Sequence, residues 1–364
     1  MNVTLADPRR RTLAVLAGTA LVFILLAALA LWRQAAELAP PRGGDAFLPE
    51  LADHEREAAR IHFASKKGSF DVVFRPNHAG ASAWVIPQKG DYPAAFPEVN
   101  KTLLNLANLK AIEPKTAQPE WFRYVDLDAP PKGAGTEITV KDEKGRTLAS
   151  LIVGKSEEIG DAGGATGLFV RRPGENQSWL VRSESGFQTD VNGWLDKTAL
   201  DLDPTRIQST IVTAADGSSY ELVRDAKTDA HFKLAAMPAG RTLSNEGAPD
   251  SPADALSGFS FEDAKPAGRV DFSHAAHIRT RTFDGLQIDA AVAKIGTEYW
   301  VSLEAANVGN SPSVAKEARD INARAAGWAY KLADYKGAQF TTPLESLLAP
   351  KGGAKPAATP VPEQ

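Results

Sequence analysis

The sequence predicts an α+β protein, in which an N-terminal transmembrane helix is followed by a duplicated unit of antiparallel β-meander with packed helices. Three observations lead to this prediction. An uncharged apolar run occupies residues 12–32. Short strands rich in β-branched and aromatic residues begin near Ile61. A succession of strand, helix, meander and helix then occurs in each half of the remaining chain.

The bulk composition is that of a globular protein with a real core. The chain has 364 residues, of which 43% are apolar and 24% are charged. Its formal net charge of -4 gives no overall field that would attract nucleic acid. The absence of cysteine excludes disulfides, thiolate metal sites, cysteine nucleophiles and a lipid-modified N-terminal cysteine. Any membrane anchor must therefore be made of protein.

The apolar run at residues 12–32 has the length of a membrane-spanning helix. A helix of this length spans about 30 Å, the thickness of the hydrocarbon core of a bilayer. Basic residues precede it, namely Arg9, Arg10 and Arg11. The positive-inside rule places residues 1–11 in the cytoplasm and the body of the protein outside, and Trp32 stands where an interfacial aromatic would. We expect a single-pass inner-membrane protein with a periplasmic body.

A cleaved signal peptide is the competing interpretation, because Ala28-Leu29-Ala30 fits the small-x-small cleavage pattern. The apolar run is longer than the usual 7–15 residues, roughly, of a signal peptide, which favours an uncleaved anchor. In both cases the body lies outside the cytoplasm, where ATP is not normally available.

Shifts in composition divide the chain after the anchor. Residues 33–57 read as a linker and a short stalk helix. The segments 58–205 and 206–348 are the two expected α+β repeats, and the Pro/Ala-rich tail at 349–364 should be disordered.

Each expected repeat contains its own helices and hairpins. In the first, apolar residues at helical spacing predict an amphipathic helix over 96–110, and Pro119 begins a second short helix. Two hairpins follow, with turns at Glu143–Arg146 and Pro173–Asn176.

The second repeat is expected to have a turn at Asp216-Gly217 and a helix capped by Ser251. A meander turns at Asp284-Gly285 and Gly296-Thr297, and a helix runs from Pro312 to Tyr335 and includes Trp328.

The string LASLIVGKS, at residues 148–156, ends like a phosphate-binding P-loop. The P-loop pattern needs a glycine at position 149, where this chain has Ala149, and a helix directly after the lysine. Here apolar strand formers precede Gly154, and a Gly-rich segment follows. We therefore interpret Gly154-Lys155 as the end of a strand and expect no nucleotide binding.

Two other constellations have simple structural explanations. His274 and His277 would share a helix face, but their segment reads as the start of a strand, which would separate the rings. Several acids lie beside Trp194, as paired carboxylates do in a glycosidase: Asp190, Asp196, Asp201 and Asp203. They are more simply explained as caps and turn residues, with Asp190 capping a helix and Asp203-Pro204 starting a turn.

The basic and aromatic side chains follow the strand and helix patterns. Arg171-Arg172 and Arg279/Arg281 are expected on solvated sheet faces. Core packing is expected for the tryptophans outside the anchor, which are Trp84, Trp121, Trp179, Trp194, Trp300 and Trp328.

The order of motifs resembles a known bacterial family. The anchor, SAWVIP, DYPAAFPEVNKTLLNLANLKAIEPKT, PEWFRYVDLD, LASLIVGK, FVRRPGENQSWLV and GWLDK are similar to the family called domain of unknown function 4340. The resemblance covers most of residues 61–200. It implies a membrane-anchored accessory component of a gliding-motility-type ABC transporter and its extracytoplasmic partner, and it supplies no catalytic motif.

We therefore expect a non-catalytic accessory or scaffold component that contacts an ABC transporter permease, without cofactor, metal, nucleotide or nucleic acid. The alternative is a periplasmic module that binds a cell-envelope glycan or a lipid, which an exposed Trp121 or Trp300 in a groove would support. A hydrolase would need Asp196 and Asp201 close together in a cleft. The Gly-rich loop at 160–167 is a further expected contact site.

Overall fold

The computed structural model describes Gly18, 20–22, 24–27, 46–76, 83–159 and 166–351. The described residues before 28 are helical, and Leu21 and Ile24 among them are exposed. No helix within the described residues is long and apolar enough to cross a bilayer. Arg9, Arg10, Arg11 and Trp32 lie outside these residues, as do 160–165 of the Gly-rich loop and 352–364 of the tail.

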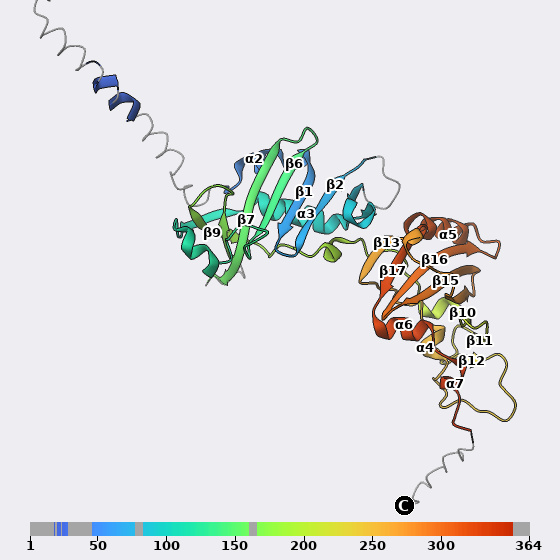
Figure 1. Ribbon diagram of the computed structural model, residues 1–364. Helices are drawn as coiled ribbons and strands as arrows, with labels where there is room; N and C mark the ends of the chain where they lie inside the picture. Colours follow the sequence, from blue (N-terminus) through green and yellow to red (C-terminus); the bar gives the residue numbers. More distant parts are fainter. Residues whose placement is uncertain are drawn as a thin grey trace, which may run out of the picture.

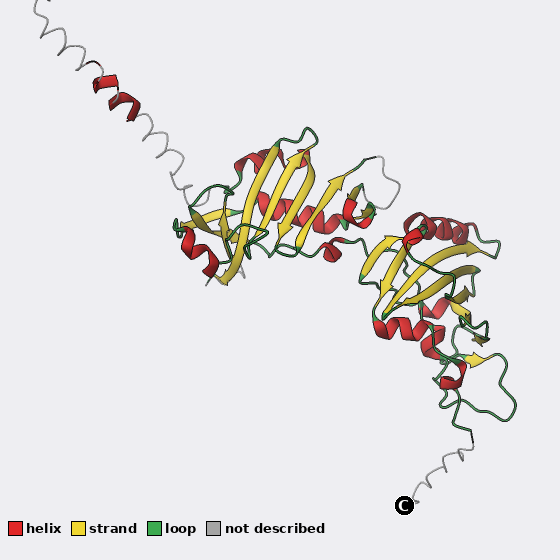
Figure 2. Ribbon diagram, viewed as in Figure 1, coloured by secondary structure: helices red, strands yellow, loops and turns green. Residues whose placement is uncertain are grey.

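Two antiparallel sheets organise the part of the chain that the structure describes (Figures 1 and 2). The first has the order β4-β3-β2-β1-β6-β7-β8-β9-β5 and the second the order β12-β11-β10-β14-β15-β16-β17-β13. We call each sheet with its helices a domain. The predicted α+β class with antiparallel sheets is confirmed.

The strands of the first sheet are β1 (Ala58–Ser65), β2 (Gly68–Phe74), β3 (Trp84–Ile86), β4 (Tyr92–Pro93), β5 (Lys110–Pro114), β6 (Thr136–Asp142), β7 (Thr147–Glu158), β8 (Thr166–Arg171) and β9 (Ser178–Ser183). Those of the second are β10 (Ile207–Thr213), β11 (Ser219–Val223), β12 (Lys233–Leu234), β13 (Asp263–Pro266), β14 (Ala276–Thr282), β15 (Leu286–Ile295), β16 (Glu298–Asn307) and β17 (Trp328–Leu332). The α-helices are α2 (Pro49–His54), α3 (Phe96–Ala107), α4 (Asp250–Ala253), α5 (Pro312–Ala325), α6 (Asp334–Phe340) and α7 (Leu344–Leu347). Short 3₁₀ helices are η1 (Glu55–Glu57), η2 (Pro87–Lys89), η3 (Pro119–Tyr124), η4 (Val191–Trp194), η5 (Pro204–Arg206) and η6 (Ala267–Arg269).

The two strand orders correspond. Read from β2 to β5, the first sheet runs β2-β1-β6-β7-β8-β9-β5, and the second runs β11-β10-β14-β15-β16-β17-β13. In each sheet the strand that precedes the meander in sequence, β5 or β13, pairs with the last strand of the meander. The main difference is α5, which lies between β16 and β17, whereas β8 and β9 are joined by a turn.

The core of the first domain forms where α3 covers one face of the sheet (Figure 2). Val99, Leu103 and Leu106 of α3 are buried there, as their helical spacing predicts. Part of the expected linker and stalk belongs to this domain, because Phe47 and Leu51 are fully buried in the same core.

The second domain corrects two helix predictions. Helix α5 ends at Ala325, and Trp328 lies in β17, which pairs with β13 and β16. Gly327, with φ of 82°, allows the chain to leave the helix. Ser251 does not cap its helix, because α4 begins at Asp250 after Pro249.

An aromatic junction joins the domains. Tyr92 of β4 packs against Trp328, with ring centroids 4.8 Å apart and an interplanar angle of 81°. Lys197 Nζ donates a 2.8 Å hydrogen bond to the carbonyl oxygen of Phe261, and Lys89 pairs with Asp263 at 2.5 Å. Apolar and charged contacts therefore both hold the domains, which lie beside each other in Figure 1.

Candidate functional site

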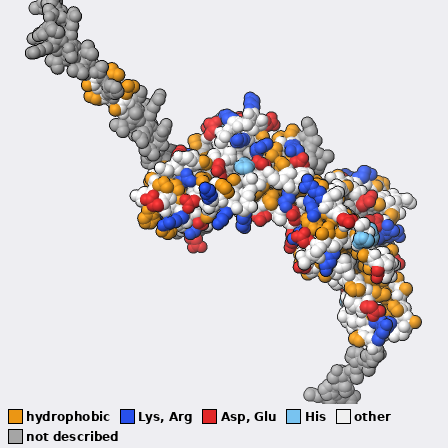
Figure 3. Space-filling view, in the orientation of Figure 1, with side chains coloured by type: hydrophobic (Ala, Val, Ile, Leu, Met, Phe, Trp, Pro, Cys, Tyr) orange, Lys and Arg blue, Asp and Glu red, His pale blue; other side chains and the backbone are white. Residues whose placement is uncertain are grey.

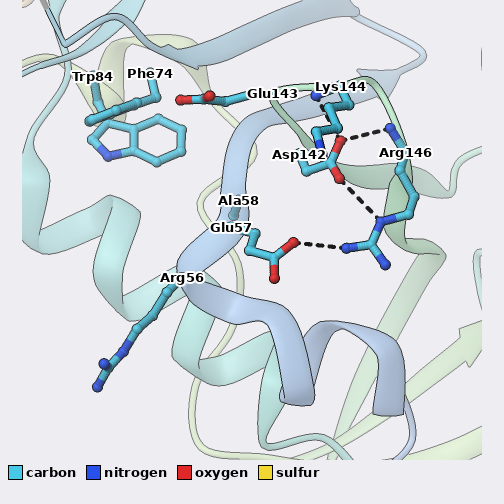
Figure 4. Close-up of a pocket in the computed structure, with 9 residues that line it drawn as sticks. All are labelled: Arg56, Glu57, Ala58, Phe74, Trp84, Asp142, Glu143, Lys144 and Arg146. Carbon is cyan, nitrogen blue, oxygen red and sulfur yellow. Dashed lines mark hydrogen bonds and ion pairs between the residues drawn. The ribbon is translucent and has the colours of Figure 1, made fainter.

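A depression of about 610 Å³ opens on the first domain, between η1, the β6–β7 turn and the β2–β3 pair (Figure 4). Its lining residues are Arg56, Glu57, Ala58, Phe74, Trp84, Asp142, Glu143, Lys144 and Arg146. One wall is aromatic and the opposite wall is charged.

The aromatic wall follows from strand register. Phe74 of β2 and Trp84 of β3 are direct cross-strand partners, so their side chains lie on the same face. Their ring centroids are 5.5 Å apart, and the ring planes are tilted by 55°. Trp84 is buried and Phe74 is half-buried, so it is mainly the Phe74 ring that a bound group could contact at this wall.

The charged wall is built on the β6–β7 turn. Gly145 adopts φ of 82°, which a glycine allows without steric penalty. Asp142 Oδ1 accepts hydrogen bonds from the backbone N–H groups of Lys144 (2.9 Å) and Arg146 (2.8 Å). The Asp142 side chain thus fixes the turn, and its Oδ2 accepts a further bond of 3.1 Å from Arg146 Nε.

Arg146 also ties the turn to the segment before β1. Its Nη1 donates to Glu50 Oε1 at 2.7 Å and its Nη2 to Glu57 Oε2 at 2.9 Å. Hydrogen bonding to Asp142, together with the nearby carboxylates, raises the pKa of Arg146. Burial opposes ionisation of Asp142, but the bonds from Arg146 and Lys144 outweigh it and lower its pKa. These groups are therefore fixed charges at neutral pH, which suits them to binding and not to proton transfer.

The lining groups determine what the depression can do. Three basic side chains (Arg56, Lys144 and Arg146) face three acidic ones (Glu57, Asp142 and Glu143), so the site is balanced in charge. Ser, Thr, Tyr and His do not occur among its described lining residues. Lys144 and Arg56 make no ion pair within the described part of the chain, and Figure 4 shows the Arg56 side chain extending away from Arg146. The depression can bind a partner through stacking and ion pairs.

The LASLIVGKS string lies in β7, which confirms the strand interpretation but corrects its end. The strand continues past Gly154 to Glu158, with a register irregularity between Val153 and Ser156. A Cβ on Gly154 would lie 2.0 Å from the carbonyl oxygen of Val125. The glycine is explained by the close approach of the segment after η3, and Lys155 Nζ donates to the Tyr124 carbonyl oxygen at 3.0 Å.

The acids near Trp194 act as caps. Asp190 accepts from the N–H of Asn192, and Asp203 accepts from the N–H of Thr205, as predicted. Asp196 accepts hydrogen bonds from the backbone and the hydroxyl of Thr198. Local backbone geometry therefore accounts for Asp190, Asp196 and Asp203, whereas Asp201 is exposed, and no hydrogen bond joins Asp196 to Asp201 in the described structure.

The histidine pair does not form a metal centre among the described residues. His277 is exposed on β14, whereas His274 precedes the strand. Groups of three or more His, Cys, Asp or Glu placed to hold a metal ion are absent from the described ranges.

The arginine prediction is half right. Arg279 is exposed on β14 and pairs with Asp289 at 2.6 Å, as expected on a solvated face. Arg171 is buried, because its guanidinium lies 4.6 Å from the centre of the Phe122 ring and donates to the Leu127 carbonyl oxygen at 3.1 Å. It holds the η3 segment against the sheet.

The tryptophan prediction holds with one clear exception. Trp84, Trp179, Trp194 and Trp300 are buried, and Trp328 is half-buried at the junction. Trp121 on η3 is 54% exposed and lies beside the exposed Tyr124, with ring centroids 5.8 Å apart. It does not line the depression.

A family model described as Domain of unknown function (DUF4340) matches residues 84–277, more than half of the sequence. The chain belongs to this family. The DUF4340 match begins at Trp84 of the aromatic wall, includes the Asp142–Arg146 turn and ends in β14 of the second domain. No curated protein and no solved structure matches the chain.

The sequence alone does not predict the depression. The β6–β7 turn was predictable from Lys144-Gly145, but its partners Glu50 and Glu57 come from 96 and 89 residues earlier. The register of β2 and β3 decides that Phe74 faces the same space. The one available signal was the pair of aromatic residues next to predicted strand ends.

Proposed function

We propose that this DUF4340 protein is a non-catalytic accessory component of an ABC-type transport system, held in the inner membrane by residues 12–32 with its two domains in the periplasm. In this proposal the depression on the first domain accepts a protruding segment of the permease or of its extracytoplasmic partner. The anchor and the orientation rest on the apolar run and on the arginines before it.

The observation that carries the proposal is the chemistry of the depression. Arg146, Asp142 and Glu57 are ionised and fixed by hydrogen bonds, and the opposite wall is an aromatic pair. A site of this composition matches the aromatic and arginine content of protein interfaces. Figure 3 shows acidic and basic side chains interspersed over the visible face of both domains, which suits specific docking more than attraction by one sign of charge.

Site-specific photocrosslinking tests the proposal in the full chain. A benzoylphenylalanine replaces Lys144 at the rim of the depression, and a second variant carries it at Lys316, which is exposed on α5. We expect the probe at position 144 to crosslink to a permease subunit or its extracytoplasmic partner, with at least about tenfold lower yield at position 316. Equal yields at the two positions, or no transporter crosslink at position 144, would overturn the role of the depression.

A glycan- or lipid-binding module is the second candidate, and Trp121 is the observation in its favour. The exposed Trp121–Tyr124 pair, with the Arg123 guanidinium 4.8 Å from the Tyr124 ring centre, could stack on a sugar face. Trp300 argues against it, because that ring is buried beneath the Lys265 ammonium at 3.6 Å. Binding of cell-wall glycan fragments that is lost in Trp121→Ala would favour this candidate over docking.

We also infer that the two domains arose by duplication. The matching strand orders support this, and so does a shared packing device. In the first domain, residues between β5 and β6 cover Ile152 on the outer face of the sheet. In the second, residues between β13 and β14 cover Ala293 of β15 and Trp300 of β16, and these strands correspond to β7 and β8. The inference predicts a weak sequence match between 58–205 and 206–348 in related chains, and a comparison of these segments would test it.

A further inference from the structure

A second cavity, of about 440 Å³, lies in the second domain at one end of its sheet. Its floor consists of Val212 of β10, Tyr220 of β11, Ala276 of β14 and Val292 of β15. The backbone register places Val212 opposite Tyr220 and Ala276 opposite Val292. These side chains belong to the face of the sheet that carries the domain core, so the cavity is a continuation of that core.

The strands change from apolar to polar as they leave the core. Because side chains alternate along a strand, residues two positions apart lie on the same face. Val292 is thus followed on its face by Lys294, and Ala276 is preceded by His274. The cavity therefore has an apolar floor and a polar rim.

The roof is the segment that joins α6 to α7. Pro343 and Leu344 contribute apolar groups to the lining. The Tyr220 hydroxyl donates a hydrogen bond of 2.6 Å to the carbonyl oxygen of Thr342, which fixes the roof to the sheet. The space is consequently formed before any ligand arrives, as is usual for small-molecule sites.

The positive charge nearest the apolar floor is that of Lys294. Glu345 is paired with Arg241, whose nitrogens donate to its two oxygens at 3.2 and 3.0 Å. Asp216 accepts from the backbone N–H and the hydroxyl of Ser218 at 2.9 and 2.6 Å and keeps its negative charge, but it lies in the β10–β11 turn, separated from β15 and Lys294 by β14. Within the described structure, Lys294 has no carboxylate partner, and its ammonium lies 5.1 Å from the Tyr299 ring centre.

We propose that this cavity binds one amphipathic molecule with a single acyl chain and an anionic head, such as a fatty acid. The chain would lie over Ala276 and Val292, beneath the roof, and the head would lie at the rim beside Lys294. The volume falls within the roughly 300–1,000 Å³ of small-molecule sites and excludes a two-chain phospholipid from complete burial. The proposal is independent of any transporter partner.

Photolabelling of the full-length protein tests this proposal in the presence of a membrane or a detergent. The probe is dodecanoic acid with a diazirine in its chain, and labelled peptides are identified by mass spectrometry. We expect label on residues 212–220, 274–294 and 341–345. Excess unlabelled dodecanoate should reduce this labelling by at least about tenfold, and dodecanol should reduce it much less. Label that is spread over the chain, or that dodecanoate does not reduce, would overturn the proposal.

Matched variants separate the floor from the rim. Ala276→Phe fills the floor, and Lys294→Glu reverses the charge beside the proposed head while leaving the core intact. We expect each variant to lower the specific labelling by about tenfold or more. Lys101→Glu, at an exposed position of α3 in the first domain, should leave it unchanged. If Ala276→Phe fails to fold, Lys294→Glu decides alone, and undiminished labelling in that variant would contradict the assignment.

Discussion

Lys197 and Phe261 join the two domains through a double contact. The Lys197 ammonium donates a 2.8 Å hydrogen bond to the Phe261 carbonyl oxygen and lies 4.2 Å from the centre of the Phe261 ring. Burial lowers the pKa of Lys197, an effect that Asp263 opposes and the neighbouring charge of Lys89 reinforces. The contact is therefore made by a partly desolvated cation, for which both interactions are stronger than at an exposed site.

Lys197→Ala should weaken the junction without altering either sheet. Loss of the hydrogen bond and the cation–π contact should lower the free energy of unfolding by about 1–2 kcal/mol. Urea denaturation measures the change, with Lys101→Ala, at an exposed position of α3, as the control. An unchanged midpoint for Lys197→Ala would mean that the aromatic packing around Tyr92 holds the domains without it.

Gly154→Ala should be strongly unfavourable, although it is a small change in a strand. The new methyl group would meet the Val125 carbonyl oxygen at 2.0 Å and push the η3 segment off the sheet. We expect a loss of about 1–3 kcal/mol in thermal or urea unfolding. Gly186→Ala is the matched control, because open space surrounds that position. Equal stability of the two variants would refute the packing explanation of Gly154.

Asp254 should make stability depend on pH. Burial raises its pKa to about 6, against the opposing effect of Arg224, while Asp250 adds to the rise and Lys336 opposes it. The folded state thus binds a proton more tightly than the unfolded chain, so stability is full below pH ~4 and falls as pH rises through about 6. Its Oδ1 has no hydrogen-bond partner among the described residues.

Asp254→Asn removes this penalty. We expect a gain of about 1–2 kcal/mol at pH 8, less than the roughly 3 kcal/mol of a two-unit shift because Asp254 is partly exposed. The gain should disappear near pH 4. Urea titrations at several pH values measure it, and a gain of the same size at pH 4 and pH 8 would exclude titration of Asp254 as the cause.

Asn322 substitutes for a missing strand. Strand β17 pairs with β16 only over Tyr299–Val301, so the backbone farther along β16 has lost that partner. Asn322 Oδ1 accepts from the Ala305 N–H at 2.8 Å, and its Nδ2 donates to the Ala305 carbonyl oxygen at 2.7 Å. Asn322→Ala should cost about 1–3 kcal/mol in unfolding free energy. Lys316→Ala, exposed on the same helix, should cost far less, and similar losses would contradict this role.

The sequence predicts local structure in this chain better than it predicts the candidate site. Turns at Glu143–Arg146 and Asp284-Gly285, and helix α3, follow from glycine placement and apolar period. The strand at Trp328 was missed although Gly327 marked the helix end, because a short apolar run does not distinguish strand from helix. The contacts of Arg146 with Glu50 and of Phe74 with Trp84 depend on register between distant segments. No local pattern could reveal them.

Co-purification from membranes in mild detergent tests the central claim most directly. The full-length chain with a C-terminal tag is compared with residues 33–364, and mass spectrometry identifies the proteins that accompany each. An ABC permease or its ATPase that accompanies the full-length chain, and is lost from the shorter one, is the result we predict. Recovery of no transporter subunit with the full-length chain would contradict the assignment of this protein to an ABC-type transport system.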